Sequence, residues 1–419
     1  MASLQELVRQ LSSLSVFRGL RELPLLRSYE TLLRSAAEFD PDDPSPLFDT
    51  WGAFFKTACD CKAEEDFAGA VTEQILYDDN AFSRAAANGE EISSQLAYAA
   101  QRDLKILLET AQIQPETILK ESGAGKTLSV DGLPRWKPGR PVRQLAGTVS
   151  ECMEQLKSFY LTHGCGVYAR YRAFIWREGE IRPVRHPDPI SIEDLKGYEY
   201  PRSLVIENTE AFLQGMPANN CLLYGDRGTG KSSTVKAIMN RYFDEGLRVI
   251  EIPKESVAEF PCLLEQIAEI PLRFLIFIDD LSFSHQDETY TSLKAVLEGG
   301  VASRPRNTLI YATSNRRHLV RETFSDREGD EIHRGDTIEE SLSLADRFGL
   351  TVNFSHPGKQ EYLAIVRALA EQRGIADRIP NLEQEAEQWA LLRGGRSPRC
   401  AVQFIDRAEA QAGSGNTIL

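Results

Sequence analysis

Long hydrophobic runs are missing from this sequence of 419 residues. Its longest apolar stretches are far shorter than the roughly 18 residues that would suggest a membrane-spanning helix. The first residues, Met1 to Glu6, have neither the basic region nor the apolar core of a secretory signal. We therefore expect a cytoplasmic protein without a membrane segment.

Cysteine and histidine are few and scattered. The seven cysteines are odd in number, and only Cys59 and Cys61 lie close together in the sequence. A C-x-C pair without further ligands is a weak sign of a metal site, and the six histidines do not cluster. We expect free thiols in a reducing compartment.

Positive charge is also in deficit, since 48 Lys and Arg residues face 62 Asp and Glu residues, for a net charge of −14. This balance argues against nonspecific nucleic-acid binding by the surface as a whole. Basic residues concentrate locally in 135–143 and 170–185, and aromatic residues lie in or beside these segments: Trp136, Tyr168, Tyr171 and Trp176. Such a segment could hold single-stranded nucleic acid, but more often it is a solvated face or packs on acidic neighbours.

The length suffices for two domains of ordinary size. Residues 1–120 carry apolar side chains at helical spacing, as in Leu4, Leu7 and Leu11. A group of prolines between residues 183 and 189 interrupts the chain farther on. We predict a mainly helical N-terminal domain over residues 1–186, whose role stays open.

Residues 225–232 read Gly-Asp-Arg-Gly-Thr-Gly-Lys-Ser, a complete G-x-x-x-x-G-K-[ST] phosphate loop. The apolar run 221–224 predicts a buried strand before it, and the residues up to Tyr242 predict a helix after it. Backbone N–H groups and the positive helix end would then point at bound phosphates. The predicted binding residues are Gly225, Asp226, Arg227, Gly228, Thr229, Gly230, Lys231, Ser232 and Ser233.

Two side chains of this loop have expected tasks in phosphate chemistry. Lys231 would reach the β- and γ-phosphates, and the Ser232 hydroxyl would bind Mg²⁺. A chance match in a glycine-rich turn is the alternative, and the flanking strand and helix argue against it.

Two aspartates follow a second apolar strand. Residues 274–278 are entirely apolar, as in a strand buried on both faces of a parallel sheet, and Asp279 and Asp280 come next. Ligands bind at the carboxyl ends of such strands, so Asp279 would hold Mg²⁺ and Asp280 would act as general base on water. The alternative is a simple turn at the end of a strand.

Other strands complete the pattern of an α/β sheet. We expect strands over 247–252, 307–315 and 350–354, with Asn315 at the polar tip of the second. Residues 394–401, Gly-Gly-Arg-Ser-Pro-Arg-Cys-Ala, open a helix within a small helical region.

This ordered set of motifs resembles the AAA+ ATPase superfamily over about residues 188–413. Several strings are also similar to a bacterial family of predicted AAA+ ATPases filed as a domain of unknown function: 293–300, 311–319, 331–333 and 343–350. The resemblance implies a parallel five-stranded sheet flanked by helices over 187–355, with a strand inserted between those that carry the phosphate loop and Asp279. It further implies a C-terminal helical lid over 356–419.

The resemblance also implies roles for single residues. Asn315 matches the sensor-1 position, Arg347 matches the arginine finger that reaches a neighbouring subunit, and Arg399 matches sensor 2, with Arg396 as the weaker candidate. For Arg347, an ordinary ion pair with a carboxylate is the alternative. Many relatives carry Glu where this chain has Asp280, and the shorter side chain could slow turnover.

We therefore expect an ATP-binding, Mg²⁺-dependent ATP hydrolase that works as a homo-oligomer, a ring or partial ring. Its partner would be an unidentified protein or nucleic acid. The alternative is a slow, ATP-regulated switch or scaffold that holds a protein partner through the N-terminal domain.

Overall fold

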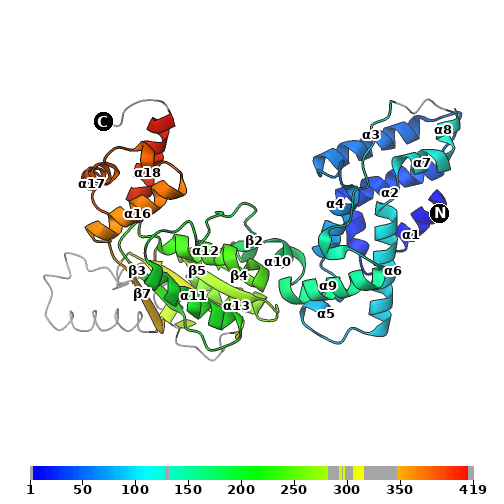
Figure 1. The fold of residues 1–419 in the computed structure, drawn as a ribbon. Coiled ribbons are helices and arrows are strands. Elements are labelled where there is room, and N and C mark those ends of the chain that lie inside the picture. Colours follow the sequence, from blue (N-terminus) through cyan, green and yellow to red (C-terminus); the bar gives the residue numbers. More distant parts are fainter. Residues whose placement is uncertain are drawn as a thin grey trace. The chain divides into compact units, whose positions relative to one another are not determined.

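The structure is a computed structural model that describes residues 3–127, 132–281, 292–294, 296–297, 305–315 and 347–413. The chain divides into two compact units, Met1–Arg170 and Tyr171–Leu419 (Figure 1).

All regular secondary structure in the described residues of the first unit is helical, as the apolar spacing of residues 1–120 predicts. Its longer helices are α1 (Leu4–Ser12), α2 (Pro24–Ala37), α3 (Ser45–Asp60), α4 (Phe67–Leu76), α5 (Ala81–Ala87), α6 (Ser94–Ala111), α7 (Pro115–Ser122) and α9 (Val149–His163). The short helices are η1 (Arg18–Glu22), α8 (Ala124–Thr127), η2 (Arg143–Leu145) and α10 (Gly166–Arg170).

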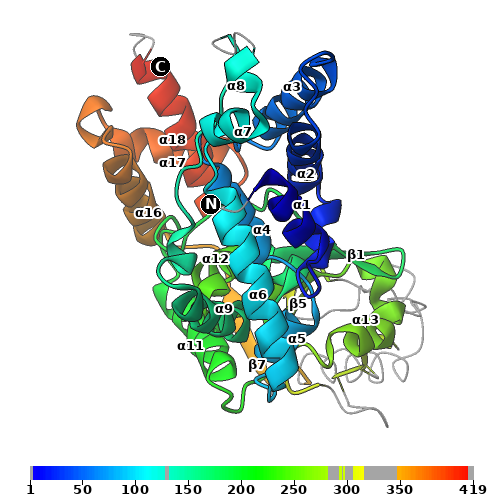
Figure 2. The same ribbon diagram turned by 90° about the vertical axis from the view of Figure 1, so that its right-hand side faces the viewer.

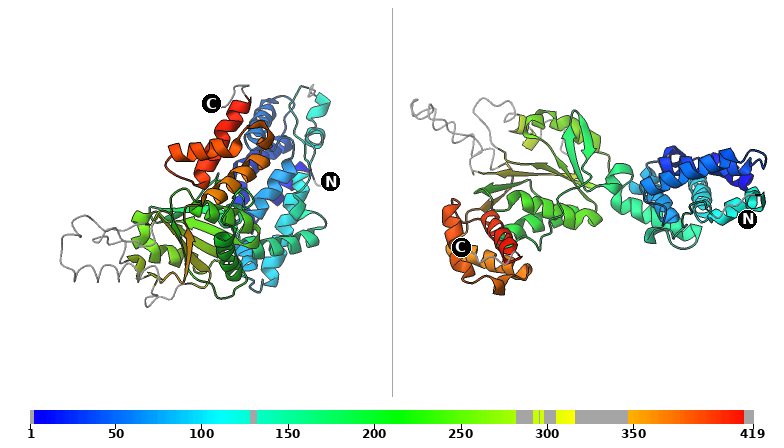
Figure 3. Two further views of the ribbon diagram at one scale, coloured as in Figure 1. Left: turned by 60° about the vertical axis from the view of Figure 1, so that its left-hand side comes forward. Right: turned by 90° about the horizontal axis from the view of Figure 1, so that it is seen from above.

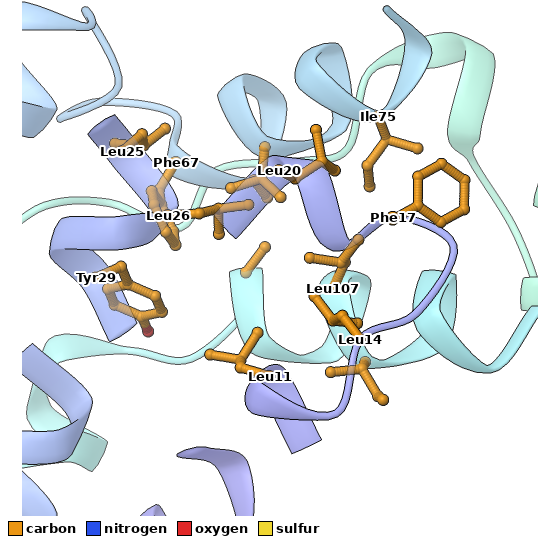
Figure 4. Packing of buried hydrophobic residues seen from close by; sticks show 14 of the residues in the cluster. Leu11, Leu14, Phe17, Leu20, Leu25, Leu26, Tyr29, Phe67, Ile75 and Leu107 are labelled. Atoms are coloured by element: carbon orange, nitrogen blue, oxygen red, sulfur yellow. The ribbon is translucent and has the colours of Figure 1, made fainter. Parts of the chain in front are cut away.

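A single hydrophobic cluster forms the core of this unit. Figure 4 shows side chains of the N-terminal segment, such as Leu14 and Phe17, meeting Ile75 of α4 and Leu107 of α6. The turn after α1 is held by the fully buried Asp103, whose carboxylate accepts the backbone N–H groups of residues 15, 16 and 17 at 2.7, 2.7 and 3.2 Å. The unit therefore has its own packed interior.

Burial removes two of the aromatic side chains that the basic segments could offer for stacking on bases. Trp136 is 2% exposed and packs against Trp51 and Phe54, with ring centroids 5.1 and 4.6 Å apart. In the second unit, Trp176 is fully buried and donates its indole N–H to Glu259 at 2.8 Å. These two residues are part of the interior, so the stacking interpretation is wrong for them.

Several basic residues near them pair with acidic neighbours. Arg135 contacts Glu116 at 2.8 Å, and Lys137 forms an ion pair with Glu65. In the segment 135–143, these two basic residues therefore pair with acidic neighbours, as the alternative interpretation expects.

The second unit contains a sheet of seven strands in the order β2-β1-β4-β5-β6-β3-β7. The strands are β1 (Ala173–Arg177), β2 (Glu180–Pro183), β3 (Cys221–Gly225), β4 (Leu247–Glu251), β5 (Arg273–Ile278), β6 (Thr308–Ser314) and β7 (Leu350–Phe354). All neighbouring strands are parallel except β1 and β2, which form an antiparallel pair.

Two predictions from the sequence are corrected by β1 and β2. Strands β3 to β7 are the five parallel strands that the family resemblance implies. The sheet has two more strands, because β1 pairs with β4 and β2 pairs with β1. Because β1 pairs with Val249 and its neighbours in β4, the first unit ends at Arg170 and not at residue 186.

Helices cover both faces of this sheet. Helix α11 (Glu199–Leu213) and helix α12 (Lys231–Tyr242) contribute to one cluster with alternate residues of the strands. Helix α13 (Phe260–Ile267) lies on the opposite side, as Figures 2 and 3 show. Strand β5 is buried along nearly all of its length for this reason, which its apolar sequence predicts.

The order of the strands decides where the polar strand ends meet. Strand β6 lies between β3 and β5, which confirms the expected inserted strand. Parallel strands present their carboxyl ends at one edge, so the phosphate loop, Asp279 and Asn315 come to the same edge of the sheet.

The chain after β7 forms a small helical subdomain, here called the C-terminal helical subdomain (359–413). It contains α16 (Lys359–Gln372), η6 (Ala376–Arg378), α17 (Leu382–Leu392) and α18 (Pro398–Gly413). These helices share a hydrophobic cluster of their own, against which the half-buried Tyr198 also packs. Among the described residues, none of the helices combines the length and apolarity needed to cross a membrane.

Candidate functional site

A cavity of about 710 Å³ lies at the carboxyl edge of the sheet in the second unit. Its walls come from the phosphate loop, the ends of β5 and β6, the segment 190–198, and helices α16 and α18. All residues from Arg227 to Ser233 line this cavity, together with Asp279, Asp280, Asn315 and Arg399.

 Most of the predicted residues therefore line one cavity, whereas Gly225, Asp226 and Arg347 are not among its lining residues.

The phosphate loop has a backbone that only glycine adopts easily. Gly225, Gly228 and Gly230 have φ values of +131°, +75° and +94°. A Cβ on Gly225 would lie 2.3 Å from the carbonyl oxygen of Phe354 in β7. The loop is thus tied closely to β7, and it turns directly into α12, whose first residue is Lys231.

The Lys231 amine lies beneath the loop. Its Nζ donates to the carbonyl oxygens of Gly225 and Asp226 at 2.9 and 2.7 Å, and to Asn315 Oδ1 at 3.4 Å. Burial lowers the pKa of Lys231, and the nearby carboxylates, Asp226 first among them, oppose that shift. A cation in this position is suited to the charge of a bound phosphate.

Ser232 and Asp279, the two residues predicted to bind Mg²⁺, are in contact with each other. The Ser232 hydroxyl donates to Asp279 Oδ1 at 2.6 Å. Hydroxyl and carboxylate oxygens suit Mg²⁺, which usually takes one or two protein ligands and completes its shell with phosphate oxygens and water. The described residues contain no cluster of three or more His, Cys, Asp or Glu side chains that could hold a metal alone.

Asp280 and Asn315 are also in contact. The Asn315 side-chain amide donates to Asp280 Oδ1, while its own oxygen accepts from Lys231. Asp280 has a φ of +51°, in the left-handed region that non-glycine residues rarely adopt. Lys231, Asn315 and Asp280 therefore form one chain of polar contacts along the edge of the cavity.

The two arginines considered for the sensor-2 position differ in their surroundings. Arg399 lines the cavity, and its backbone N–H donates to the carbonyl oxygen of Gly228 at 3.1 Å. Arg396 forms two hydrogen bonds to the carboxylate of Glu387 within the C-terminal helical subdomain. The geometry thus favours Arg399 as the residue that faces a ligand.

Arg347 occupies a different place. It lies in a turn just before β7 and is not among the described residues that line the cavity. Of the strings that carry the family resemblance, residues 331–333 and parts of the other three lie outside the described residues.

Thr313 is a residue that the motif search missed. It is 2% exposed in β6, and its hydroxyl donates to Asp279 Oδ1 at 2.5 Å and accepts the Asp280 N–H at 2.9 Å. The signal that could have found it is the period of two in a strand, which puts Thr313 and Asn315 on the same face.

The segment between β7 and α16, here called the hinge (355–358), is contacted by Tyr198 and by the phosphate loop. Tyr198 stacks on Phe354 with ring centroids 5.5 Å apart and donates its hydroxyl to the carbonyl oxygen of Ser355 at 2.6 Å. Burial raises the pKa of Tyr198. Asp226 of the phosphate loop accepts the backbone N–H of His356 at 2.7 Å, so loop and hinge are joined.

Part of the cavity wall is apolar. This wall is contributed by Ile190, Leu195, Ile365, Leu369 and Val402. An apolar surface beside a phosphate loop can accommodate a flat base while the loop holds the phosphates. The arrangement as a whole can bind a nucleoside polyphosphate, carry a divalent cation and position a water molecule.

Comparisons with known proteins agree with the expected relation to a family of unknown function. Residues 169–412 match the family model described as Protein of unknown function (DUF815). Among solved structures, a mutant of RuvB from Thermogota maritima is similar, with 16% identity and a TM-score of 0.37 over 55% of this chain and 68% of that chain. No curated protein matches the sequence significantly.

Proposed function

The chain belongs to the DUF815 family, and from its site we propose that it binds ATP and hydrolyses the β–γ phosphoanhydride bond in the presence of Mg²⁺. The observation that carries this proposal is the contact network of Lys231, Ser232, Asp279, Asp280 and Asn315 at one edge of a cavity. We further propose that the protein acts as a homo-oligomer on a macromolecular partner.

Phosphate binding is the task of the loop and of α12. The backbone N–H groups of residues 226–232 and the positive end of α12 attract the phosphate oxygens. Lys231 offsets the charge that develops as the γ-phosphoryl group is transferred. When bound, Mg²⁺ would be held by Ser232 and Asp279 and would offset negative charge on the phosphates.

Water activation is the task of Asp280 and Asn315. The Asp280 carboxylate accepts a proton from the attacking water, and Asn315 holds that carboxylate in place through its amide. The water oxygen attacks the γ-phosphorus, the bond to the bridging oxygen breaks, and ADP leaves with the electron pair. Aspartate is one methylene shorter than the glutamate of many relatives, so we expect slow turnover.

Two arginines complete the proposed site. Arg399 contacts the phosphates from α18, and closure of the C-terminal helical subdomain brings it closer, as a lid would. Arg347 is supplied to the site of a neighbouring subunit, because it lies outside the cavity wall of its own chain. Such an arginine is worth about 10³–10⁵ in rate in related phosphoryl-transfer enzymes.

A second candidate function has a specific observation in its favour. The first unit has a complete core of its own, and the burial of Trp136 removes a stacking residue from its basic segment. These features suit a protein partner better than a single-stranded nucleic acid. A slow, ATP-regulated switch that holds a protein through this unit is therefore the alternative to a motor.

The test is ATP hydrolysis at increasing protein concentration, with sedimentation of the same samples. We would compare the wild type with Lys231→Ala and Arg347→Ala, and use Arg396→Ala as a control for loss of a positive charge. Activity that rises with assembly, vanishes in the first two variants and persists in the control would support an oligomeric ATPase. Tight ATP binding without turnover at any concentration would refute the hydrolase and favour the switch.

A further inference from the structure

We propose that Thr313 is a positioning residue that sets the geometry of both carboxylates in the site. The proposal rests on the proposed hydrolysis of ATP, because it concerns how Asp279 and Asp280 are aimed. Thr313 would not touch the nucleotide; it would act through these two aspartates.

The Thr313 hydroxyl serves both residues at once. A hydroxyl has one hydrogen to donate and lone pairs to accept with. Here Oγ1 donates to Asp279 Oδ1 at 2.5 Å and accepts the backbone N–H of Asp280 at 2.9 Å. Because Thr313 is 2% exposed, water cannot readily replace either bond.

The backbone of Thr313 reinforces this arrangement. Strands β5 and β6 pair with Ile278 opposite Ala312, so Thr313 lies beside the point where the chain leaves β5. The N–H of Leu281 then donates to the carbonyl oxygen of Thr313 at 2.7 Å. The two-residue turn formed by Asp279 and Asp280 is thus held on β6 by one residue through its side chain and its carbonyl group.

This turn determines where the Asp280 carboxylate lies. With a φ of +51°, Asp280 leaves the extended path of β5, and its carboxylate reaches the amide of Asn315. Without the bond to Thr313, the Asp280 N–H would keep only its longer bond of 3.2 Å to Asp279 Oδ1, and Asp279 would itself have lost a donor. The backbone could then return toward an extended conformation and carry the Asp280 carboxylate away. The position of this short side chain is therefore set by the backbone turn.

The same hydroxyl orients the expected metal ligand. Asp279 Oδ1 accepts from Ser232, from Thr313 and, at 3.2 Å, from the backbone N–H of Asp280. Within the described part of the chain, no hydrogen bond reaches the other carboxylate oxygen of Asp279, Oδ2. The fixed Oδ1 would leave Oδ2 to face the cation, in the way that outer hydrogen-bond partners orient ligands at metal sites.

The test replaces the hydroxyl with a methyl group in Thr313→Val, which keeps the shape and the β-branch. Thr313→Ser restores the hydroxyl, and Thr313→Ala removes it without adding bulk should valine prevent folding. The control is Thr308→Val, which removes a fully buried threonine hydroxyl at the opposite end of β6. We would measure kcat and KM for ATP, the binding of Mn²⁺ to the ATP complex by electron paramagnetic resonance, and the melting temperature.

We expect Thr313→Val to lower kcat and the Mn²⁺ affinity by about 10- to 100-fold, the usual effect of losing such an outer partner. KM for ATP should change little because the phosphate loop is intact, and Thr313→Ser should recover most of both losses. Equal kcat and Mn²⁺ affinity in Thr313→Val and wild type, or equal losses in Thr308→Val, would overturn the proposal. A wild type that does not hydrolyse ATP would refute the proposed function instead, and the Mn²⁺ measurement would still decide the role of Thr313.

Discussion

The close approach of the phosphate loop to β7 predicts a large difference between two glycines of the same loop. Gly225 and Gly230 both have positive φ, so alanine at either position strains the backbone at a cost of about 1–3 kcal/mol. A Cβ on Gly230 would meet nothing within 4 Å, whereas one on Gly225 would lie 2.3 Å from the Phe354 carbonyl oxygen. Gly230→Ala is therefore a matched control for strain alone.

The extra cost at Gly225 comes from forcing two strands apart. Gly225 pairs with Phe354 in the ladder of β3 and β7, and the Asp226 N–H donates to the Phe354 carbonyl oxygen at 3.0 Å. We expect overpacking to cost about 1–3 kcal/mol and the loss of this hydrogen bond about 1 kcal/mol, or about 2–4 kcal/mol together. For a unit of this size, each kcal/mol lowers the melting temperature by about 2–4 °C.

The assay is thermal unfolding without nucleotide, followed by circular dichroism or a fluorescent dye. Gly225→Ala should melt roughly 4–16 °C below Gly230→Ala, because the strain common to both variants cancels in the comparison. Equal melting temperatures of the two variants would refute the reasoning, since they would mean that β7 can move away from the loop at little cost.

Two further results are expected. Arg399→Ala should weaken the binding of a fluorescent ATP analogue at least several-fold, because Arg399 lines the cavity. Arg396→Ala should leave this binding near the wild-type value, because Arg396 is paired with Glu387, and equal losses in fluorescence titrations of the two variants would contradict the assignment. In the first unit, burial acts to raise the pKa of Glu30, but the hydrogen bonds and charge of Arg21, with bonds from Ser12 and Arg34, lower it overall. Stability from Glu30 is thus present above its unfolded pKa and is lost as the pH falls through the lower folded value. Glu30→Gln should cost about 1.5–3 kcal/mol in urea unfolding at pH 7 and less as the pH is taken below the unfolded pKa of Glu30, and an equal cost across this pH range would count against the ion pair.

The parts of the fold that could be predicted are those that local sequence determines. The phosphate loop has glycines where the backbone needs positive φ, and the apolar run of β5 marks a strand covered on both faces. The inserted strand β6 was expected from the resemblance. These features depend on neighbours in the chain or on a known order of motifs.

The parts that were missed depend on contacts between distant segments. The prolines between residues 183 and 189 predict a domain boundary at residue 186, but β1 pairs with β4 and β2 with β1, so residues 173–183 belong to the sheet of the second unit. Trp136 reads as an exposed aromatic among basic residues, and only tertiary packing buries it. Thr313 carries no motif of its own, since its role follows from the register of β6 against β5.

The phosphate loop is bonded to the chain at the entry to the C-terminal helical subdomain and again inside that subdomain. His356, just before α16, donates its backbone N–H to Asp226, and Arg399, at the start of α18, donates its backbone N–H to the carbonyl oxygen of Gly228. A chimaeric protein with this subdomain taken from a distant relative would therefore have to match the loop at two places that are far apart in sequence. Asp226, at the second position of the loop, is one of the residues that such an exchange would have to match. Exchange experiments should therefore transfer the phosphate loop and the C-terminal helical subdomain together.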